Sequence, residues 1–155
     1  VVHQSEEGAV PKVDFSMAKK ILETVVAAIR SGQVTACHDL SRGGLFVALT
    51  EMAITSDLGF KVNLARVSAD SPRADIKLFS ETYGRFLLTC SKAALENLIA
   101  LFAQEGIPIS SIGEVTEAKQ LLLELPEGNP IINLPLLEIK YLWAMRMDEE
   151  MAGRK

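Results

Sequence analysis

Helix-like and strand-like hydrophobic patterns follow one another along this chain in an irregular order, and that order constrains the fold more than any other feature. After Asp14, a good helix N-cap, apolar residues recur at helical spacing over residues 15–30, until Ser31 and Gly32 end the pattern. Residues 33–39 are short, apolar and rich in strand formers. The chain is therefore predicted to begin with a helix and a strand.

The next part of the chain also changes from a helix-like to a strand-like hydrophobic pattern. A polar, glycine-containing loop at residues 41–44 precedes a second helical pattern, which begins at Leu45. Residues 58–67 then alternate apolar and polar side chains, as a strand with one solvent-exposed face does. Residues 68–75 are typical of a connection, and a helical turn is predicted at 76–79.

The last third begins with a run of residues, 85–90, that predicts a buried strand. Ser91 is predicted to cap the helix that follows, and Gly106 to end it. Residues 107–115 and 120–125 then look like two strands joined by a polar turn, so a hairpin is predicted there.

The chain is predicted to close with a helix that has Pro135 in its first turn. Its apolar face is expected to pack on the domain through Leu137, Tyr141, Leu142 and Met145. Trp143 on the same helix is interpreted as a packing residue or an interface anchor.

Mixed runs of helices and strands favour an α+β domain, with helices on a mixed or largely antiparallel sheet, over a strictly alternating doubly wound fold. The length of 155 residues and the 48% hydrophobic and 23% charged content indicate one globular domain and argue against disorder. We expect a lead-in segment at 1–13 and a single domain at 14–155. Because the chain starts with Val1 and a loose segment, we expect the domain to be excised from a longer polypeptide.

The net charge and the cysteine content indicate which partners this protein can bind and in which cellular compartment it is found. The 16 Lys and Arg against 20 Asp and Glu give a net charge of -4, and the basic residues form no stripe, which argues against nucleic acid. Cys37 and Cys90 lie far apart, so reduced thiols are expected. No apolar stretch approaches the roughly 20 residues that span a bilayer, and no basic and apolar leader is present. We expect a soluble, cytoplasmic protein without membrane partners.

Polar side chains and two glycines separate the first predicted strand from the second helix. The candidate binding residues in this first loop are His38, Asp39, Ser41, Gly43 and Gly44. Glycine lets a backbone approach a ligand closely, and the N–H groups of a helix's first turn attract phosphate or carboxylate. Alternatively, the glycines form only a tight turn and Ser41 only caps the helix. The loop contains neither GxxxxGK[ST] nor GxGxxG.

Two side chains of this loop have further candidate roles. Asp39 could bind Mg²⁺ or a ribose hydroxyl, since hard cations prefer carboxylates, or it could serve as a helix cap. His38 has no Cys or His partners at metal-ligand spacing, so zinc is not indicated, and a lone histidine is more often structural than catalytic.

A second polar cluster, residues 79–85, lies just before the predicted strand at 85–90. Its candidate binding residues are Glu81, Thr82, Tyr83 and Arg85. Glu81 could bind ribose hydroxyls or a metal, and Arg85 could bind phosphate. Alternatively, Glu81 and Arg85 form an internal ion pair that braces the turn. No residue of either cluster is a clear general base, so the catalytic residues stay unassigned.

Two long motifs carry a family resemblance. HDLSRGGLFVALTEMA at 38–53 and LFSETYGRFLLTC at 78–90 resemble the carboxy-terminal domain of the aminoimidazole ribonucleotide synthase superfamily, and within it the phosphoribosylformylglycinamidine synthases. Residues 8–14, 112–115 and 134–136 support the resemblance. It implies a three-layer α/β/α domain that follows an ATP-binding domain of the same polypeptide.

The resemblance also implies an activity. In that family, an ATP-dependent carbon–nitrogen ligase converts formylglycinamide ribonucleotide to formylglycinamidine ribonucleotide in purine biosynthesis. The amide oxygen is phosphorylated to an iminophosphate, and ammonia then displaces phosphate. The reaction uses ATP and Mg²⁺, with ammonia from a glutaminase subunit, and a small subunit completes the complex. We expect the isolated domain to be inactive and to bind neither ATP nor Mg²⁺ tightly.

The family's large subunit is internally duplicated, and its halves differ. The first half reads QDLGAAG and SESQER and contacts substrate and metal, whereas HDLSRGG and SETYGR here follow the second half. Asp39 matches the metal-binding Asp, and residues 81–83 match the substrate-contacting tripeptide, with Tyr83 in place of Gln. In some members the second half holds a structural nucleotide. Two alternatives therefore stay open: a structural or docking half of the same enzyme, and the carboxy-terminal domain of another member such as thiamine monophosphate kinase.

Overall fold

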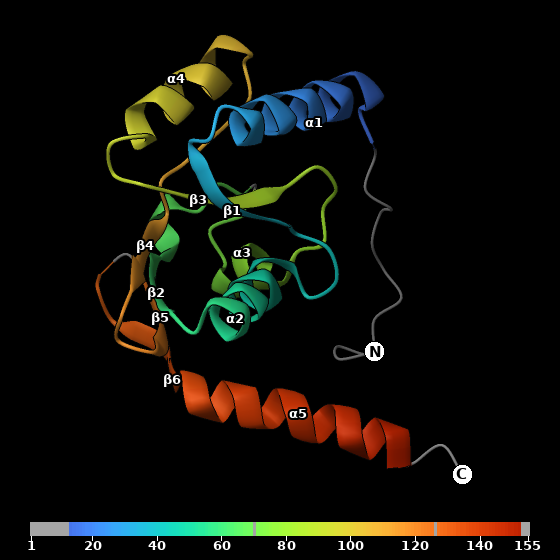
Figure 1. The fold of residues 1–155 in the computed structure, drawn as a ribbon, viewed down its shortest axis with the longest axis vertical. Helices are drawn as coiled ribbons and strands as arrows, with labels where there is room; N and C mark the ends of the chain where they lie inside the picture. Colours follow the sequence, from blue (N-terminus) through green and yellow to red (C-terminus); the bar gives the residue numbers. More distant parts are fainter. Residues whose placement is uncertain (1–12, 70, 126, 153–155) are drawn as a thin grey trace.

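The computed structural model describes residues 13–69, 71–125 and 127–152, and Figure 1 shows the path of the chain. Almost all of the predicted lead-in segment lies outside these residues. The elements, in chain order, are α1 (Phe15–Arg30), β1 (Val34–Asp39), α2 (Gly44–Ser56), β2 (Gly59–Asn63), a short 3₁₀ helix (Leu64–Arg66), α3 (Ala74–Phe79), β3 (Phe86–Cys90), α4 (Leu95–Gln104), β4 (Gly113–Thr116), β5 (Gln120–Glu124), β6 (Pro130–Pro135) and α5 (Leu136–Ala152). The predicted α+β class is confirmed.

A two-stranded antiparallel sheet, β1 with β3, forms the middle layer of one part of the fold. Successive strand residues face opposite sides, so Phe86, Leu88 and Cys90 pack under α1 and α4 while Leu87 faces the core around α2. Figure 1 shows α1 and α4 on one side of these strands and α2 and α3 on the other. This order of layers agrees with the predicted α/β/α arrangement, although Leu87 is the only buried residue of β3, which was predicted to be a buried strand.

The second sheet has four strands in the order β4-β2-β5-β6, and it corrects the predicted hairpin. Strand β2 lies between the two strands of that hairpin, antiparallel to β4 and parallel to β5. The turn at 117–119 therefore crosses the beginning of β2 at Gly59. A Cβ at Gly59 would lie 2.5 Å from the carbonyl oxygen of Gln120, so the crossing needs a residue without a side chain.

Two hydrophobic clusters hold these layers together. The larger lies between α2 and the four-stranded sheet, and its most deeply buried side chains are Leu49, Val62, Leu64, Leu121 and Leu123. The smaller lies beneath α1 and α4 and consists of Val25, Ala28, Leu98, Phe102 and Ile107. Because β3 contributes to both clusters, the two-stranded sheet connects them.

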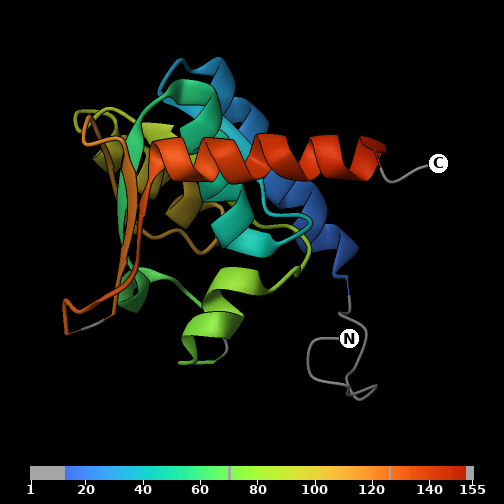
Figure 2. The same ribbon diagram turned by 90° about the horizontal axis from the view of Figure 1, so that it is seen from below.

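The last strand and helix differ from the sequence prediction. Pro135 ends strand β6, which was not predicted, and α5 begins after it at Leu136. Among residues 136–145 of α5, the part whose side chains are described, Leu136 and Ile139 are buried in the core. The predicted packing face, Leu137, Tyr141, Leu142 and Met145, is exposed instead. Figures 1 and 2 show α5 running beside α2, and Trp143 lines a pocket with Glu51, Ile54 and Thr55 of that helix. The side of α5 with Leu136 and Ile139 faces the core, and the predicted face lies on the other side.

None of the helices described here combines the length and the apolar composition that a membrane crossing requires. The two cysteines, Cys37 and Cys90, are both free thiols. Cys37 is exposed as a residue, but its thiol is partly shielded from water. This desolvation raises the pKa of the thiol, and the nearby negative charge of Asp39 raises it further.

Candidate functional site

The first polar loop connects β1 to α2 through two left-handed glycines. Strand β1 ends at Asp39, and the next N–H, from Leu40, donates to the carbonyl oxygen of Arg85 at 2.9 Å. Gly43 and Gly44 have φ values of +79° and +63°, which L-residues with side chains rarely adopt. The N–H of Gly44 donates to the carbonyl oxygen of Ser41 at 3.1 Å, closing the turn before α2.

Gly44 also sets how closely the two polar loops approach. A Cβ at this position would lie 2.8 Å from the carbonyl oxygens of Leu78 and Ser80, which belong to the end of α3 and the residue after it. A side chain at residue 44 would thus push the start of α2 away from the second loop. The glycine allows the backbones of the first and second polar loops to lie in contact.

The carboxylate of Glu81 joins the two loops directly. Its Oε1 accepts a hydrogen bond from the N–H of Gly43, the residue just before α2, at 2.7 Å. The Ser41 side chain makes no such bond, so the alternative in which Ser41 caps α2 is wrong. The protein's own carboxylate thus lies at the helix start and occupies the N–H of Gly43, while the N–H groups of the first turn, which were expected to attract a ligand anion, begin one residue later.

The other residues of the second loop are arranged around Glu81. The guanidinium of Arg85 donates to the carbonyl oxygen of Ser80 at 3.2 Å, and burial lowers the pKa of Arg85. The alternative Glu81–Arg85 ion pair is not among the salt bridges of the described residues. The hydroxyl groups of Thr82 and Ser80 form a hydrogen bond of 2.8 Å. Tyr83 is 66% exposed.

His38 contacts α2 rather than the second loop. Its Nε2 lies 2.9 Å from a carboxylate oxygen of Glu51, and its Nδ1 lies 2.6 Å from the carbonyl oxygen of Asp39. Both ring nitrogens thus have protein partners. A pocket of about 310 Å³ next to the ring is lined by His38, Glu51, Ile54, Thr55 and Trp143. The ring of His38 therefore lies against α2 and does not contact the second loop, although His38 was predicted as a binding residue of the first loop.

Asp39 is the candidate metal ligand, and its side chain is 63% exposed at the end of β1. Its Oδ1 lies 3.8 Å from Nδ1 of His38. The described residues contain no group of three or more His, Cys, Asp or Glu side chains able to hold a metal ion. A fully protein-built metal cage is therefore absent from the described part of the chain. One exposed carboxylate does fit Mg²⁺, which commonly binds one or two carboxylates together with substrate phosphates and water.

Sequence reasoning missed one polar cluster entirely. Asp57, at the end of α2, accepts hydrogen bonds from Lys119 in the β4–β5 turn and Lys140 in α5. These two ammonium groups lower the pKa of Asp57 to about 2. The lysines are 62 and 83 residues away in sequence, so no local pattern could have connected them to Asp57.

A family profile covers most of the region just described. The profile for "AIR synthase related protein, C-terminal domain" matches residues 1–125, which include both polar loops. This chain belongs to that family. The family was predicted from the two motifs, and the match confirms it.

The relatives place this domain within longer proteins. The chain is 36% identical over 142 residues to phosphoribosylformylglycinamidine synthase subunit PurL of Deinococcus radiodurans, covering 92% of this chain and 18% of that protein. The chain thus spans about a fifth of the length of its curated relatives.

Solved structures of Thermotoga maritima PurL share the fold. The complex with FGAR superposes with a TM-score of 0.77 at 19% identity, covering 88% of this chain and 23% of that one. The complex with ATP gives 0.71 at 21% identity, covering 78% and 21%. The PurLQS structure gives 0.75 at 21% identity, covering 83% and 22%. At these identities the likeness establishes the fold.

Proposed function

We propose that this domain is part of a phosphoribosylformylglycinamidine synthase, the ATP-dependent ligase that converts formylglycinamide ribonucleotide to the amidine with ammonia. The proposal is supported by the name of the relative that shares 36% identity across almost the whole chain. It is supported also by the two motifs, which lie within the family match. Because the relatives are about five times longer, the activity would require parts of the enzyme outside this domain.

Within that enzyme, we assign ligand binding to the two joined polar loops. The observation that carries this assignment is the 2.7 Å hydrogen bond between Glu81 and the N–H of Gly43, because it makes one surface from loops 38 residues apart. Asp39, Thr82 and Tyr83 are exposed on these loops. Carboxylate and hydroxyl groups suit ribose hydroxyls and metal-bound phosphate.

The candidate cofactors are Mg²⁺ and ATP; ATP would supply the phosphoryl group in this reaction, and Mg²⁺ would bind the phosphate oxygens. Asp39 would hold Mg²⁺ together with phosphate oxygens, since the described residues offer no complete set of ligands. Arg85 would bind phosphate through its other N–H groups, since one Nη1 donor is bonded to the carbonyl oxygen of Ser80. The Thermotoga maritima structure with ATP supports a nucleotide in the complete enzyme.

The proposed partners are the other domains of the same polypeptide, a glutaminase subunit that delivers ammonia, and the small subunit. The PurLQS structure of the Thermotoga maritima relative supports a multisubunit complex. Exposed residues on the described part of this chain, such as Tyr83 and Tyr141, offer surfaces for such contacts.

A second role, that of a structural half within the same enzyme, is favoured by one specific observation. Both ring nitrogens of His38 and one carboxylate oxygen of Glu81, Oε1, have partners inside this domain. In that role the loops would brace the start of α2, and ligand contacts would be made by the other half of the enzyme.

Single-turnover formation of the amidine in the intact synthase distinguishes the two roles. Asp39→Asn removes a charge from an exposed side chain, and Glu114→Gln on β4 is the matched control. For a ligand-binding half we expect Asp39→Asn to slow turnover more than about 100-fold, roughly 2.7 kcal/mol of barrier, without changing the melting temperature. Turnover equal to that of Glu114→Gln would contradict binding by Asp39 and favour the structural role.

A further inference from the structure

The peptide unit between Asp39 and Leu40 is held at both of its polar atoms. The carbonyl oxygen of Asp39 lies 2.6 Å from Nδ1 of His38, and the N–H of Leu40 donates to the carbonyl oxygen of Arg85 at 2.9 Å. A carbonyl oxygen only accepts hydrogen bonds, so Nδ1 carries the hydrogen of the first contact. The two contacts restrain the backbone at the end of β1, where the candidate metal ligand Asp39 lies.

The ring of His38 is in turn anchored on α2. His38 is opposite Leu87 in the β1–β3 pairing, and Leu87 faces the core around α2, so the ring points towards that helix. Its Nε2 lies 2.9 Å from a carboxylate oxygen of Glu51, in the middle of α2. The two side chains are only 26% and 35% exposed, so water screens this contact less than it screens one on the open surface.

Packing alone leaves the ring of His38 room to turn. The pocket of about 310 Å³ next to the ring is lined also by Ile54, Thr55 and Trp143. Without a partner for Nε2, the ring could turn into this space, and Nδ1 would lose its bond to the carbonyl oxygen of Asp39. Glu51 thus completes a chain of contacts that runs from α2, through His38, to the backbone of Asp39.

We propose that Glu51 is a positioning residue for metal binding: through His38 it fixes the backbone at Asp39 and so orients the carboxylate that would hold Mg²⁺. The inference rests on the proposed function, in which Asp39 binds Mg²⁺ together with phosphate. The Asp39 side chain is 63% exposed, and its one ion pair among the described residues is the 3.8 Å contact with His38, so its backbone sets its direction. Replacing a residue that supports a metal ligand commonly lowers metal affinity about 10- to 100-fold.

Two variants of Glu51 test this role in the intact synthase. Glu51→Ala leaves Nε2 without its partner, so the Mg²⁺ concentration for half-maximal single-turnover amidine formation should rise about tenfold. The rate at saturating Mg²⁺ should stay within about threefold of wild type, whereas a merely structural loss would lower that rate and leave the Mg²⁺ dependence unchanged. Glu51→Gln can donate an amide N–H to Nε2, which keeps the hydrogen on Nδ1, and should restore the Mg²⁺ dependence to within about threefold.

A double variant shows whether Glu51 acts through Asp39. In the Asp39→Asn background the carboxylate is already neutral, so adding Glu51→Ala should shift the Mg²⁺ dependence less than about twofold. Equal shifts in both backgrounds would overturn the proposal. If Asp39→Asn shifts the Mg²⁺ dependence and Glu51→Ala does not, the positioning role alone is wrong. If Asp39→Asn itself causes no shift, the proposed metal role of Asp39 fails, and the positioning role fails with it.

Hydrogen exchange of the enzyme without Mg²⁺ and nucleotide provides a readout that does not depend on activity. Mass spectrometry should show peptides containing the N–H of Leu40 exchanging about tenfold faster in Glu51→Ala than in wild type, because the end of β1 opens more often. Glu51→Gln should exchange like the wild type. Exchange that is the same in all three proteins would overturn the proposal, because the backbone at Asp39 would not depend on Glu51.

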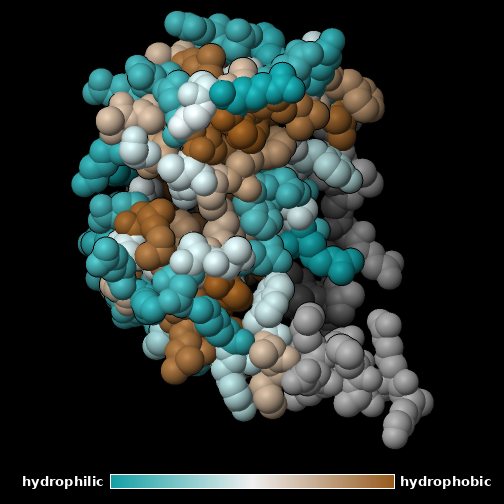
Figure 3. Space-filling model, in the orientation of Figure 1, coloured by the Kyte–Doolittle hydropathy of each residue, from teal (hydrophilic) through white to brown (hydrophobic). Residues whose placement is uncertain are grey.

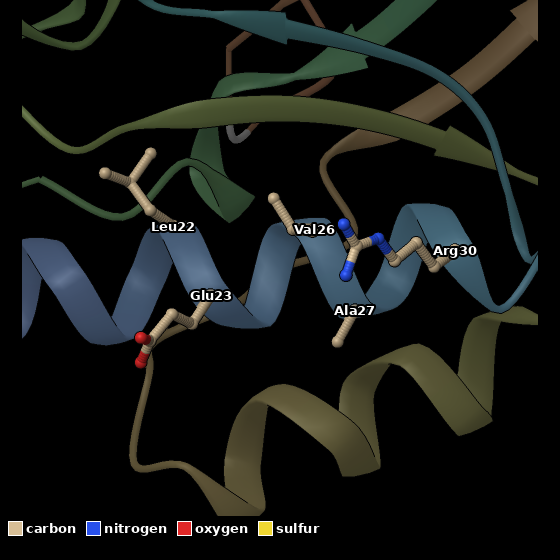
Figure 4. A pocket seen from close by; sticks show the side chains of 5 residues that line it. All are labelled: Leu22, Glu23, Val26, Ala27 and Arg30. Carbon is tan, nitrogen blue, oxygen red and sulfur yellow. The ribbon is translucent and has the colours of Figure 1, made fainter.

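Glu23→Ala is the matched control, because Glu23 is also a carboxylate within a helix. Figure 3 shows hydrophobic side chains gathered where Figure 1 draws α1, and Figure 4 shows Glu23 there beside Leu22 and Val26. Its partner Lys19 is 3.8 Å away, and both side chains are more than two-thirds exposed. The control lies across β1 and β3 from α2, so its Mg²⁺ dependence and its exchange at Leu40 should match the wild type.

Circular dichroism melts show whether each variant folds. If Glu51→Ala unfolds, Glu51→Leu takes its place, since leucine also lacks an acceptor for Nε2 and is a good helix former. Folded Glu51 variants that resemble Glu23→Ala in both the Mg²⁺ dependence and the exchange at Leu40 would overturn the proposal.

Discussion

The two ends of α2 each meet a carboxylate, and the two contacts are built in opposite ways. At the first end, Glu81 comes from another loop and accepts one backbone N–H, that of Gly43. At the second end, Asp57 belongs to the chain just after the helix and is bound by two ammonium groups, those of Lys119 and Lys140. The first contact is between one charge and a neutral group, and the second joins three charges.

The helix dipole explains this difference. A helix start carries partial positive charge, so a carboxylate is favourable there without any further partner. A helix end carries partial negative charge, which disfavours Asp57, and the two lysines offset that repulsion. The second end thus becomes a fixed junction between α2, the β4–β5 turn and α5. Near the first end, polar side chains such as Asp39 and Tyr83 stay exposed.

The largest effect is expected at Gly44, because the start of α2 leaves no space there for a side chain. Gly44→Ala should lower the free energy of unfolding by about 3 kcal/mol or more, because its Cβ meets two carbonyl oxygens at 2.8 Å and φ is positive. Urea unfolding followed by circular dichroism measures this change. Gly32→Ala is the control, since Gly32 has a φ of +73° and nothing within 4 Å. A loss of only about 1 kcal/mol is expected for it, and equal losses at both sites would contradict the close approach.

A smaller effect is expected at Glu81. Glu81→Ala removes the acceptor for the N–H of Gly43 and should cost about 1 kcal/mol of unfolding free energy, as loss of a helix cap does. Glu81→Gln retains an acceptor oxygen and should cost less. Urea unfolding again provides the measurement. If both variants match the wild type, Glu81 does not hold the two loops together.

The smallest effect, and one that depends on pH, is expected at Asp57. Its pKa in the folded protein is about 2, below the ordinary value of 3.8. The unfolded state therefore binds a proton first as the pH falls, so the contribution is complete above about pH 4 and is lost as the pH approaches 2. In urea unfolding, wild type should exceed Asp57→Asn in stability at pH 5, and the difference should shrink towards pH 2. A difference that is constant over this range would exclude the two-lysine contact.

Prediction from sequence succeeded where the determinants are local. Helix α1 has the predicted bounds, and the N–H of Met17 donates to the carboxylate of its predicted cap, Asp14, at 3.0 Å. The alternation over β2 was also recognised, because Phe60 and Val62 face the core while Lys61 is exposed. The strand predicted at 58–67 ends at residue 63, however, and a 3₁₀ helix follows it. In both cases the pattern depends only on residues within a few positions of each other.

Prediction failed where distant segments decide the outcome. The pairing of β2 with β5 joins Phe60 to Leu121, and no short-range signal reports that β2 enters between β4 and β5. For α5, hydrophobic residues predicted a packed face, but the helix turns its other side, with Leu136 and Ile139, to the core, so Leu137 is 80% exposed. The pattern shows that a face is apolar and does not show whether this domain covers it.

For the candidate site, too, local features were predicted from sequence and contacts between distant segments were not. Each polar loop was identified from its own residues, and the structure brings the two together. The contact itself was not predicted, because the Glu81 carboxylate and the N–H of Gly43 meet only once α3 has packed on the start of α2. His38 was assigned to the same region from its sequence position, but its ring contacts Glu51 on α2.

The central claim is that the two loops form one ligand surface, and hydrogen exchange of the intact synthase tests it most directly. Mass spectrometry should be recorded with and without formylglycinamide ribonucleotide and Mg-ATP. We expect segments 41–44 and 81–84 to gain protection together, while the turn at 117–119 beside Asp57 does not change. Protection of only one segment, or of neither, would contradict the account.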